Sequence, residues 1–427
     1  MVVLVNGESK AVYGHTLSTV VPASVTGETV AHELTNMDLA MKLHYLRGVY
    51  YFRQSEIING LAILSMKEPM FPWLDVYFAV SGRIWRSSET ERPFVKCNDC
   101  GVRIIEAKCS KTIEEWLEVS ELSQWRYLVS DNVLGPDLHF SPMVYIQFTR
   151  FRCGGMAIGF SWAHVLGDAA SATNCINLWG KLLGGSPPPK SYTLHNTQKK
   201  SEKAARDSLA STKPLSAKLV DSVGDSWLSP NNCKMETYSF QITDAMLKYL
   251  MQSSQATPFE MISALVWQNL AKVREGKELK TVTICRSDHP LRGIGNLSNE
   301  QKISSVALDY SAADVELSEL AMLIAKEGTD ETKMVEGLVD KDTGKPDVVV
   351  YGANLTFVDM QGIDLYGLEL KGEKPVHVEY SIDGVGREGA VLVHQGGDGK
   401  GRILMVILPE DEITQLREML QSAFGIA

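Results

Sequence analysis

The sequence predicts an α/β protein built from two halves. Three observations predict it: the length of 427 residues, a polar break near the middle, and mixed strand and helix patterns on both sides of that break. A chain of this length exceeds what one ordinary hydrophobic core organises, so two domains are expected. The break begins with GGSPPPK at residues 184–190 and stays poor in large apolar residues to about residue 216. We therefore predict an N-terminal domain at 1–184, an exposed crossover at 185–216 and a C-terminal domain at 217–427.

In the first half, apolar residues at helical spacing predict a helix over residues 38–51. Residues 143–151 and 156–162 are expected to be strands joined by a turn at 153–155. The pattern then changes to a helix that Asp168 can cap, with Ile176, Trp179 and Leu183 on one face.

In the second half, Pro258 is expected to open a helix with an apolar stripe. Residues 348–351, 390–394 and 403–408 are strand-like, and the glycine-rich residues 396–399 form the turn between the last two. Pro409 is expected to open a final helix that has acidic residues in its first turn. Each half therefore combines a sheet with flanking helices.

Composition excludes several classes of function. The formal net charge is −10 and no basic block stands out, which argues against nucleic acid as a partner. No stretch reaches the roughly 18 apolar residues of a membrane span, and the first residues lack a signal-peptide pattern. Seven irregularly spaced cysteines suit a reducing compartment, so a cytoplasmic location is expected. We also expect a monomer. Cys97 and Cys100 have CxxC spacing, but no second ligand pair follows, so we expect no metal.

The segment WAHVLGD, residues 162–168, places His164 and Asp168 at a strand-to-helix corner. A histidine at such a corner can point into a cleft and act as a base near neutral pH. Gly167 permits a tight chain path there. Asp168 is expected to cap the helix or hold an arginine rather than to transfer a proton. Spacing alone leaves open that His164 is a histidine at the edge of the core, bonded to the backbone.

A series of motifs in fixed order resembles the plant BAHD acyltransferases and covers nearly the whole chain. The motifs are LTNMD (34–38), YFAVSGR (77–83), CNDCGV (97–102), FRCGG (151–155), HVLGD (164–168) and FEMISALVW (259–267). The resemblance implies two chloramphenicol-acetyltransferase-like domains with a channel at their interface. It implies acyl-CoA as substrate or ligand, with no tightly bound cofactor. His164 would be the general base that deprotonates an acceptor hydroxyl or amine, while Asp168 and Gly167 would be structural.

The second half of the family's site is altered in this chain. Val358 and Met360 stand where the family has the threonine and tryptophan of a Thr-Ser-Trp motif. Glu369 begins ELKGE, which replaces the family's Asp-Phe-Gly-Trp-Gly brace, and GIGN at 293–296 lacks an aromatic residue of the family's Tyr-Phe-Gly-Asn. The family's threonine can donate a hydrogen bond to the oxyanion, and losing such a donor typically costs about 2.7–4 kcal/mol.

These departures and four further segments resemble the eceriferum and glossy wax proteins of plants. The segments are LSTVVPA (17–23), LAMKLHY (39–45), VLGPDL (133–138) and YGANLTF (351–357). That branch implies a role in extending very-long-chain acyl-CoA with a β-ketoacyl-CoA synthase of the fatty acid elongase, at the cytosolic face of the endoplasmic reticulum. Two hypotheses stay open: this accessory role, and an acyl-CoA-dependent O- or N-acyltransferase that uses His164. A member of the family that has lost its ligand is a third reading.

Overall fold

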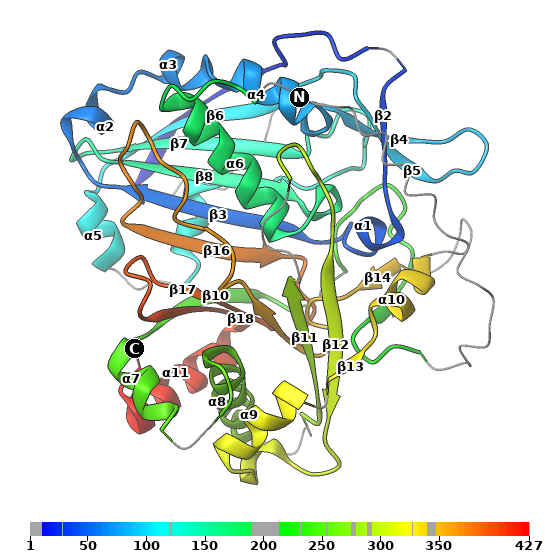
Figure 1. Ribbon diagram of the computed structural model, residues 1–427, viewed down its shortest axis with the longest axis vertical. Coiled ribbons are helices and arrows are strands. Elements are labelled where there is room, and N and C mark those ends of the chain that lie inside the picture. Colours follow the sequence, from blue (N-terminus) through cyan, green and yellow to red (C-terminus); the bar gives the residue numbers. More distant parts are fainter. Residues whose placement is uncertain are drawn as a thin grey trace.

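Two large sheets and their flanking helices form the protein in the computed structural model (Figure 1). The structure describes residues 11–27, 29–118, 122–189, 213–230, 233–252, 255–274, 279–287, 293–326, 328–339 and 347–426. Most of the predicted crossover at 185–216 lies outside these residues. The first sheet lies in the upper half of Figure 1 and the second in the lower half.

The first sheet has six strands among the described residues. Their spatial order is β1 (Val12–Val20), β6 (Val102–Cys109), β7 (Val144–Phe151), β8 (Met156–Ala163), β3 (Tyr45–Phe52) and β16 (His377–Asp383). β6 and β7 run parallel, and the remaining neighbours are antiparallel. β16 belongs to the second half of the sequence yet pairs with β3 along its full length. The sheets therefore do not follow the predicted halves strictly.

The second sheet has seven strands in the described part of the chain. In spatial order these are β10 (Met235–Ile242), β18 (Arg402–Pro409), β17 (Ala390–Gln395), β15 (Leu355–Asp359), β11 (Thr281–Ser287), β12 (Gln301–Ala307) and β13 (Thr329–Asp330). Two small sheets accompany them: β2 (Ala31–Glu33), β5 (Pro93–Lys96) and β4 (Arg83–Arg86), and the pair β14 (Asp347–Val349) and β9 (Lys218–Val220).

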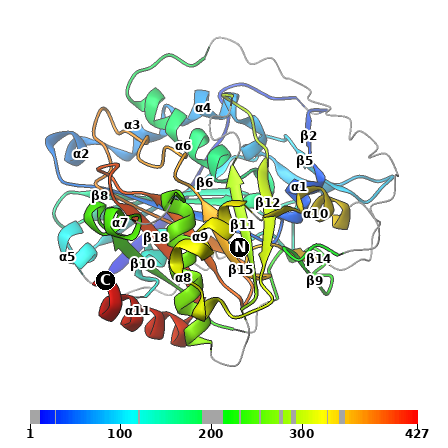
Figure 2. The same ribbon diagram turned by 60° about the horizontal axis from the view of Figure 1, so that its bottom comes forward.

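The described helices and 3-10 turns are distributed over both halves of the chain. The first half carries α1 (Asn36–Ala40), α2 (Glu56–Gly60), α3 (Ile63–Lys67), α4 (Met70–Val76), α5 (Ile113–Glu118), α6 (Ala169–Leu183) and the 3-10 turns η1 (Phe78–Ser81), η2 (Gln124–Leu128) and η3 (His164–Leu166). The second carries α7 (Asp244–Leu250), α8 (Pro258–Val273), η4 (Ala312–Asp314), α9 (Leu317–Lys326), α10 (Thr332–Val339) and α11 (Glu410–Phe424). In Figure 2, α7, α8, α9 and α11 lie together over the second sheet.

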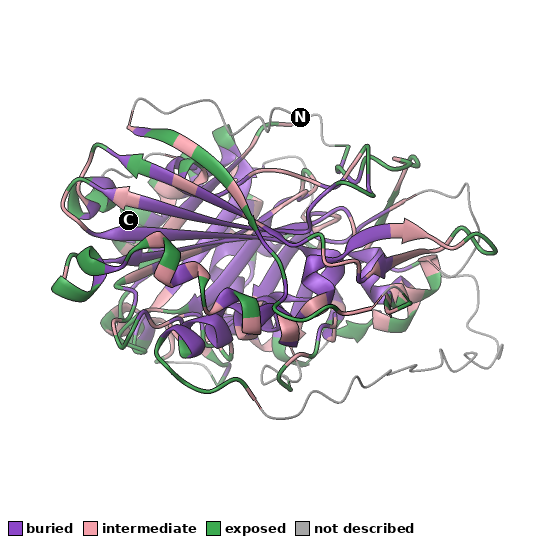
Figure 3. Cartoon of the chain, turned by 90° about the horizontal axis from the view of Figure 1, so that it is seen from above, coloured by how far each residue is buried: buried purple, intermediate pink, exposed green. Residues whose placement is uncertain are grey.

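Alternation along the strands of the second sheet separates two cores. Phe357 of β15 faces the cluster under α8 and α11. Its neighbour Val358 faces a second cluster, which also holds Trp162 of the first sheet and Trp179 of α6. Because successive strand residues point to opposite faces, one face of this sheet packs on helices and the other on the first half. Figure 3 shows the buried residues as a continuous band through the strands.

Most predicted elements are confirmed, and one is wrong. The strands at 143–151, 156–162, 390–394 and 403–408 and the helices after residues 168, 258 and 409 form as expected. The predicted helix over 38–51 is instead the short α1 followed by the strand β3. β3 lies between β8 and β16 and is buried at every position, so its apolar residues fall on both faces and also match helical spacing. The strand expected over 348–351 ends at Val349.

Candidate functional site

The corner that carries His164 forms where β8 ends. His164 opens the turn η3, and Asp168 then caps α6 by accepting a hydrogen bond from the Ser171 amide at 3.1 Å. Gly167 has φ 150°, and a Cβ there would lie 2.7 Å from Ser171 Cβ and 3.0 Å from Ser298 N. Glycine is therefore needed to bring the helix this close to the strand end. Trp162 stabilises the corner, because its indole N–H donates to the Gly167 carbonyl at 2.9 Å.

The ring of His164 is engaged by a tyrosine from the other half of the chain. Nε2 of His164 lies 3.0 Å from the hydroxyl of Tyr351, and both side chains are buried. The side-chain amide of Gln301 donates to the same hydroxyl from Nε2 at 3.1 Å. When the ring proton is on Nδ1, the Tyr351 hydroxyl donates to Nε2 while its oxygen accepts from the Gln301 side chain. The nitrogen that would act as general base therefore has its hydrogen-bond partner within the protein.

Burial keeps His164 neutral. It lowers the pKa of His164 to about 4, although the main-chain carbonyl of His164, the charge on Asp168 and the Asn299 side chain oppose the shift. The same effect lowers the pKa of the neighbouring His44 to about 3. A base works best when its pKa lies near the working pH, so His164 in this closed arrangement is a weak one. Burial also raises the pKa of Tyr351 well above its usual value, so its hydroxyl keeps its proton.

His44 joins the two sides of the site. Its carbonyl accepts from the His164 amide at 3.1 Å, and its Nε2 accepts from the Val350 amide at 3.2 Å. Its ring meets that of Tyr351 edge to face, with centroids 4.8 Å apart. The main chain of His44 therefore holds the loop that carries His164, and its side chain holds the loop that carries Tyr351.

Residues 298–300 fasten the second half of the chain to the corner. The Asp168 carboxylate accepts from the Glu300 amide at 3.2 Å, and the Asp168 amide donates to the Ser298 carbonyl at 3.1 Å. Asn299 Nδ2 donates to the His164 carbonyl at 2.8 Å and to the Asp38 carboxylate at 2.9 Å. Asp168 thus caps α6 and links the corner to residues 298–300. The role that the resemblance implies for it in the family's site stays a prediction.

The altered family positions lie in two places. Val358 is buried on β15, between Cys285 of β11 and Leu392 of β17, and its apolar side chain offers no hydrogen-bond donor. Met360 is buried just beyond the strand. Glu369 lies elsewhere, half exposed and 3.4 Å from the Lys374 ammonium. Its main chain packs against α6, where a Cβ on Gly180 would lie 2.8 Å from the Glu369 carbonyl oxygen.

The ELKGE segment keeps an ordered turn. The amide of Leu370 donates to the Glu373 carbonyl at 2.9 Å, and the Glu373 amide donates back at 3.1 Å. Lys371 and Gly372, between them, have φ 52° and 94°. Two successive positive φ values are typical of the tight two-residue turn of a hairpin. The segment that replaces the family's brace therefore still packs on α6 through a different turn.

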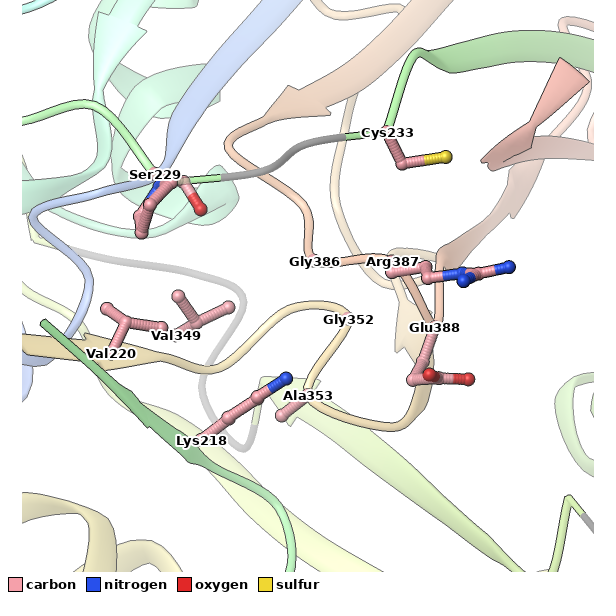
Figure 4. A pocket seen from close by; sticks show the side chains of 11 residues that line it. Lys218, Val220, Ser229, Cys233, Val349, Gly352, Ala353, Gly386, Arg387 and Glu388 are labelled. Atoms are coloured by element: carbon pink, nitrogen blue, oxygen red, sulfur yellow. The ribbon is translucent and has the colours of Figure 1, made fainter.

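A pocket with a cavity volume of about 420 Å³ lies beside the Tyr351 loop (Figure 4). It is lined by Lys218, Val220, Ser229, Pro230, Cys233, Val349, Gly352, Ala353, Gly386, Arg387 and Glu388. In Figure 4 the Lys218 side chain extends toward the Gly352 and Ala353 loop, and Arg387 and Glu388 lie on the opposite wall. Val349 and Gly352 flank the dipeptide that ends in Tyr351, so the loop that lines the pocket also carries the hydroxyl that contacts His164.

Sequence reasoning did not single out the residues that complete the site: His44, Asn299, Gln301 and Tyr351. A signal was present for two of them. His44 lies in the 39–45 segment and Tyr351 in the 351–357 segment, two of the segments on which the resemblance to the wax proteins rests. These two segments meet in space through the His44 and Tyr351 rings.

The described residues offer neither a metal cluster nor a membrane-spanning helix. No group of three or more histidine, cysteine or acidic side chains that could hold a metal ion is found among them. Cys97 is buried and Cys100 exposed, both as free thiols. In the same part of the chain, no helix combines the length and apolar character that crossing a bilayer requires.

Comparison with known proteins assigns the chain to a family. The model of the Transferase family matches residues 14–422. Protein ECERIFERUM 26-like of Arabidopsis thaliana is 40% identical over 96% of this chain and 95% of its own length. Protein ECERIFERUM 2 of Arabidopsis thaliana is 39% identical over 94% of this chain and 96% of its own length. The structure of F. graminearum TRI101 complexed with coenzyme A and deoxynivalenol shares the fold, with a TM-score of 0.69 and 14% identity over 91% of this chain and 97% of that one. The chain belongs to the BAHD transferase family and, within it, to the branch of the eceriferum proteins.

Proposed function

We propose that this protein promotes the elongation of very-long-chain acyl-CoA in cuticular wax biosynthesis, together with a condensing enzyme of the fatty acid elongase. The observation that carries the proposal is the 3.0 Å contact between His164 Nε2 and the Tyr351 hydroxyl. It occupies the nitrogen that acyl transfer would use, while the eceriferum proteins are similar along nearly the whole chain.

Two further features support an accessory role over transfer. Val358 offers no oxyanion donor at the position where the family has threonine. His164 is neutral but weakly basic, with a pKa of about 4. Neither feature prevents a fold of this kind from holding an acyl-CoA, and the similar TRI101 fold was solved with coenzyme A. An elongase partner would recruit the protein to the cytosolic face of the endoplasmic reticulum.

Co-expression tests the proposal. The protein is produced with each candidate β-ketoacyl-CoA synthase in a host with short endogenous acyl chains, and acyl chain lengths are profiled. With at least one synthase we expect products longer than the synthase makes alone. The matched controls are the synthase alone and the protein alone. Unchanged profiles with every synthase, at confirmed expression of both proteins, would contradict the accessory role.

The intact His164 corner favours a second candidate, an acyl-CoA-dependent O- or N-acyltransferase. In that reaction Nε2 takes the acceptor proton, the acceptor attacks the thioester carbonyl, the C–S bond breaks and coenzyme A leaves with the proton. The Tyr351 hydroxyl must first leave Nε2. Purified protein is incubated with acyl-CoA and alcohols or amines of graded length. Ester or amide formation that His164→Ala abolishes would establish this candidate and count against the first.

A further inference from the structure

The loop that carries Tyr351 lines the pocket, and the Tyr351 side chain contacts His164. Val349 and Gly352 line the pocket, whereas Tyr351 is only 2% exposed and turns inward. Its ring contacts His44, with centroids 4.8 Å apart, and His164, with centroids 5.4 Å apart. The loop that lines the pocket through Val349 and Gly352 therefore also carries the side chain that contacts His164.

The hydroxyl of Tyr351 stands where an acceptor would have to stand. A general base must lie within about 2.6–3.2 Å of the atom whose proton it removes. The Tyr351 hydroxyl, itself an alcohol-type O–H group, lies 3.0 Å from His164 Nε2. While it stays there, no second hydroxyl or amine has access to that nitrogen.

The main chain at Tyr351 is held in place, so access to His164 would require the Tyr351 side chain to rotate. The Tyr351 carbonyl accepts from the Gly386 amide at 2.9 Å. The next residue, Gly352, has φ 81° and packs so closely that a Cβ would lie 2.4 Å from the Gly386 carbonyl oxygen. The side chain, in contrast, is held by the Gln301 amide at 3.1 Å and by the ring packing of His44.

We propose that Tyr351 is an internal gate that separates the pocket from His164 and excludes acceptors from the acceptor position. The gate determines specificity: with Tyr351 in place the chain holds a ligand without transferring its acyl group. This deepens the proposed accessory function and rests on it for its biological meaning. The closed state itself is measurable without acyl-CoA or an elongase partner.

Histidine labelling tests the gate. Diethyl pyrocarbonate transfers an ethoxycarbonyl group to an accessible, unprotonated imidazole nitrogen and releases ethanol and carbon dioxide. Modification of His164 is measured by mass spectrometry at neutral pH against the exposed His139, which serves as the internal reference. We expect the wild type to protect His164, and Tyr351→Ala to raise its labelling by about tenfold or more, because reactivity follows the population of the open state. Tyr351→Phe keeps the ring and is expected to preserve most of the protection.

The matched control is Tyr380→Ala, which truncates another fully buried tyrosine of the same core, on β16. It is expected to leave His164 protected. Tyr351→Leu replaces Tyr351→Ala if the alanine variant does not fold, as judged by circular dichroism. The gate is refuted if wild-type His164 labels as fast as His139, if neither Tyr351 truncation exposes it, or if Tyr380→Ala exposes it equally. These outcomes are independent of the chain-length profiles, so the gate and the accessory function can fail separately.

Discussion

The hydroxyl of Tyr351 lies 3.0 Å from Nε2 of His164, and the two residues come from opposite halves of the chain. The histidine of the family motif is therefore engaged by a hydroxyl of the same chain at the nitrogen that would act as base. His164 lies at the corner of the HVLGD motif, and Tyr351 lies in one of the segments through which the sequence resembles the eceriferum proteins. The preserved fold and the closed base nitrogen together favour a protein that holds an acyl-CoA over one that transfers its acyl group.

Restoring the missing oxyanion donor alone should not create a transferase. Val358→Thr supplies a hydroxyl of a kind that is worth about 10²–10³ in rate when it points at an oxyanion, yet it leaves the acceptor position filled. We expect no release of coenzyme A from acyl-CoA with Val358→Thr, followed with a thiol reagent. Combined with Tyr351→Ala, slow hydrolysis should appear and should vanish when His164→Ala is added. Turnover by Val358→Thr alone would contradict the gate.

The sequence predicted the fold class and the His164 corner because both depend on local patterns. Strand β8, the turn at Gly167 and the cap by Asp168 are contiguous in sequence. Tyr351, Gln301 and Asn299 reach the site only through the pairing of distant strands and loops, which no local period reports. β3 was mistaken for a helix because a strand buried on both faces shows no alternation. Local strand and helix patterns can be predicted from the sequence, but the pairing of distant segments that brings Tyr351 to His164 cannot.

Asp383 should be important for stability, because it ties β16 to its neighbour β3 and to the turn η2. Its carboxylate pairs with Arg47 at 2.8 Å and with Arg126 at 2.7 Å. Burial raises the pKa of Asp383, but the two arginines outweigh it and hold the net pKa below the usual value. Asp383→Ala leaves the buried Arg47 uncompensated and should cost about 3–5 kcal/mol in the free energy of unfolding by urea.

The control for Asp383 is the exposed pair of Asp244 and Lys248. Asp244→Ala should change the free energy of unfolding by less than about 1 kcal/mol. Equal effects of the two substitutions would show that Asp383 does not hold β16 in place.

Asp168 should matter for stability independently of any chemistry. Asp168→Ala removes the cap of α6, worth about 1 kcal/mol, and leaves the Glu300 amide without its carboxylate, at about 1–3 kcal/mol. We expect a loss of about 2–4 kcal/mol in urea unfolding, with Asp168→Asn intermediate. An unchanged unfolding midpoint in Asp168→Ala would mean that neither the cap of α6 nor the hydrogen bond from Glu300 contributes to stability.

Stability should fall as the pH is lowered below about 6.5. Burial lowers the pKa of His394 to about 4. Between pH 6.5 and 4 the unfolded chain therefore binds a proton that the folded chain does not, so acid favours unfolding. This histidine accounts for about 3 kcal/mol over that range, at about 1.4 kcal/mol per pKa unit. His394→Asn should flatten the pH dependence of the unfolding free energy, whereas the exposed-site control His139→Asn should not. Parallel curves for wild type and His394→Asn would rule out this source.

The most direct test of the central claim is acyl chain-length profiling of His164→Ala, co-expressed with the condensing enzyme that responds to the wild type. His164→Gln, which retains a polar side chain, controls for loss of packing, and immunoblots control for protein level. If His164 marks the fold without acting as a base, both variants should extend acyl chains to the wild-type length. Loss of the longer products in both variants, at equal protein level, would contradict the claim and assign the base an active role.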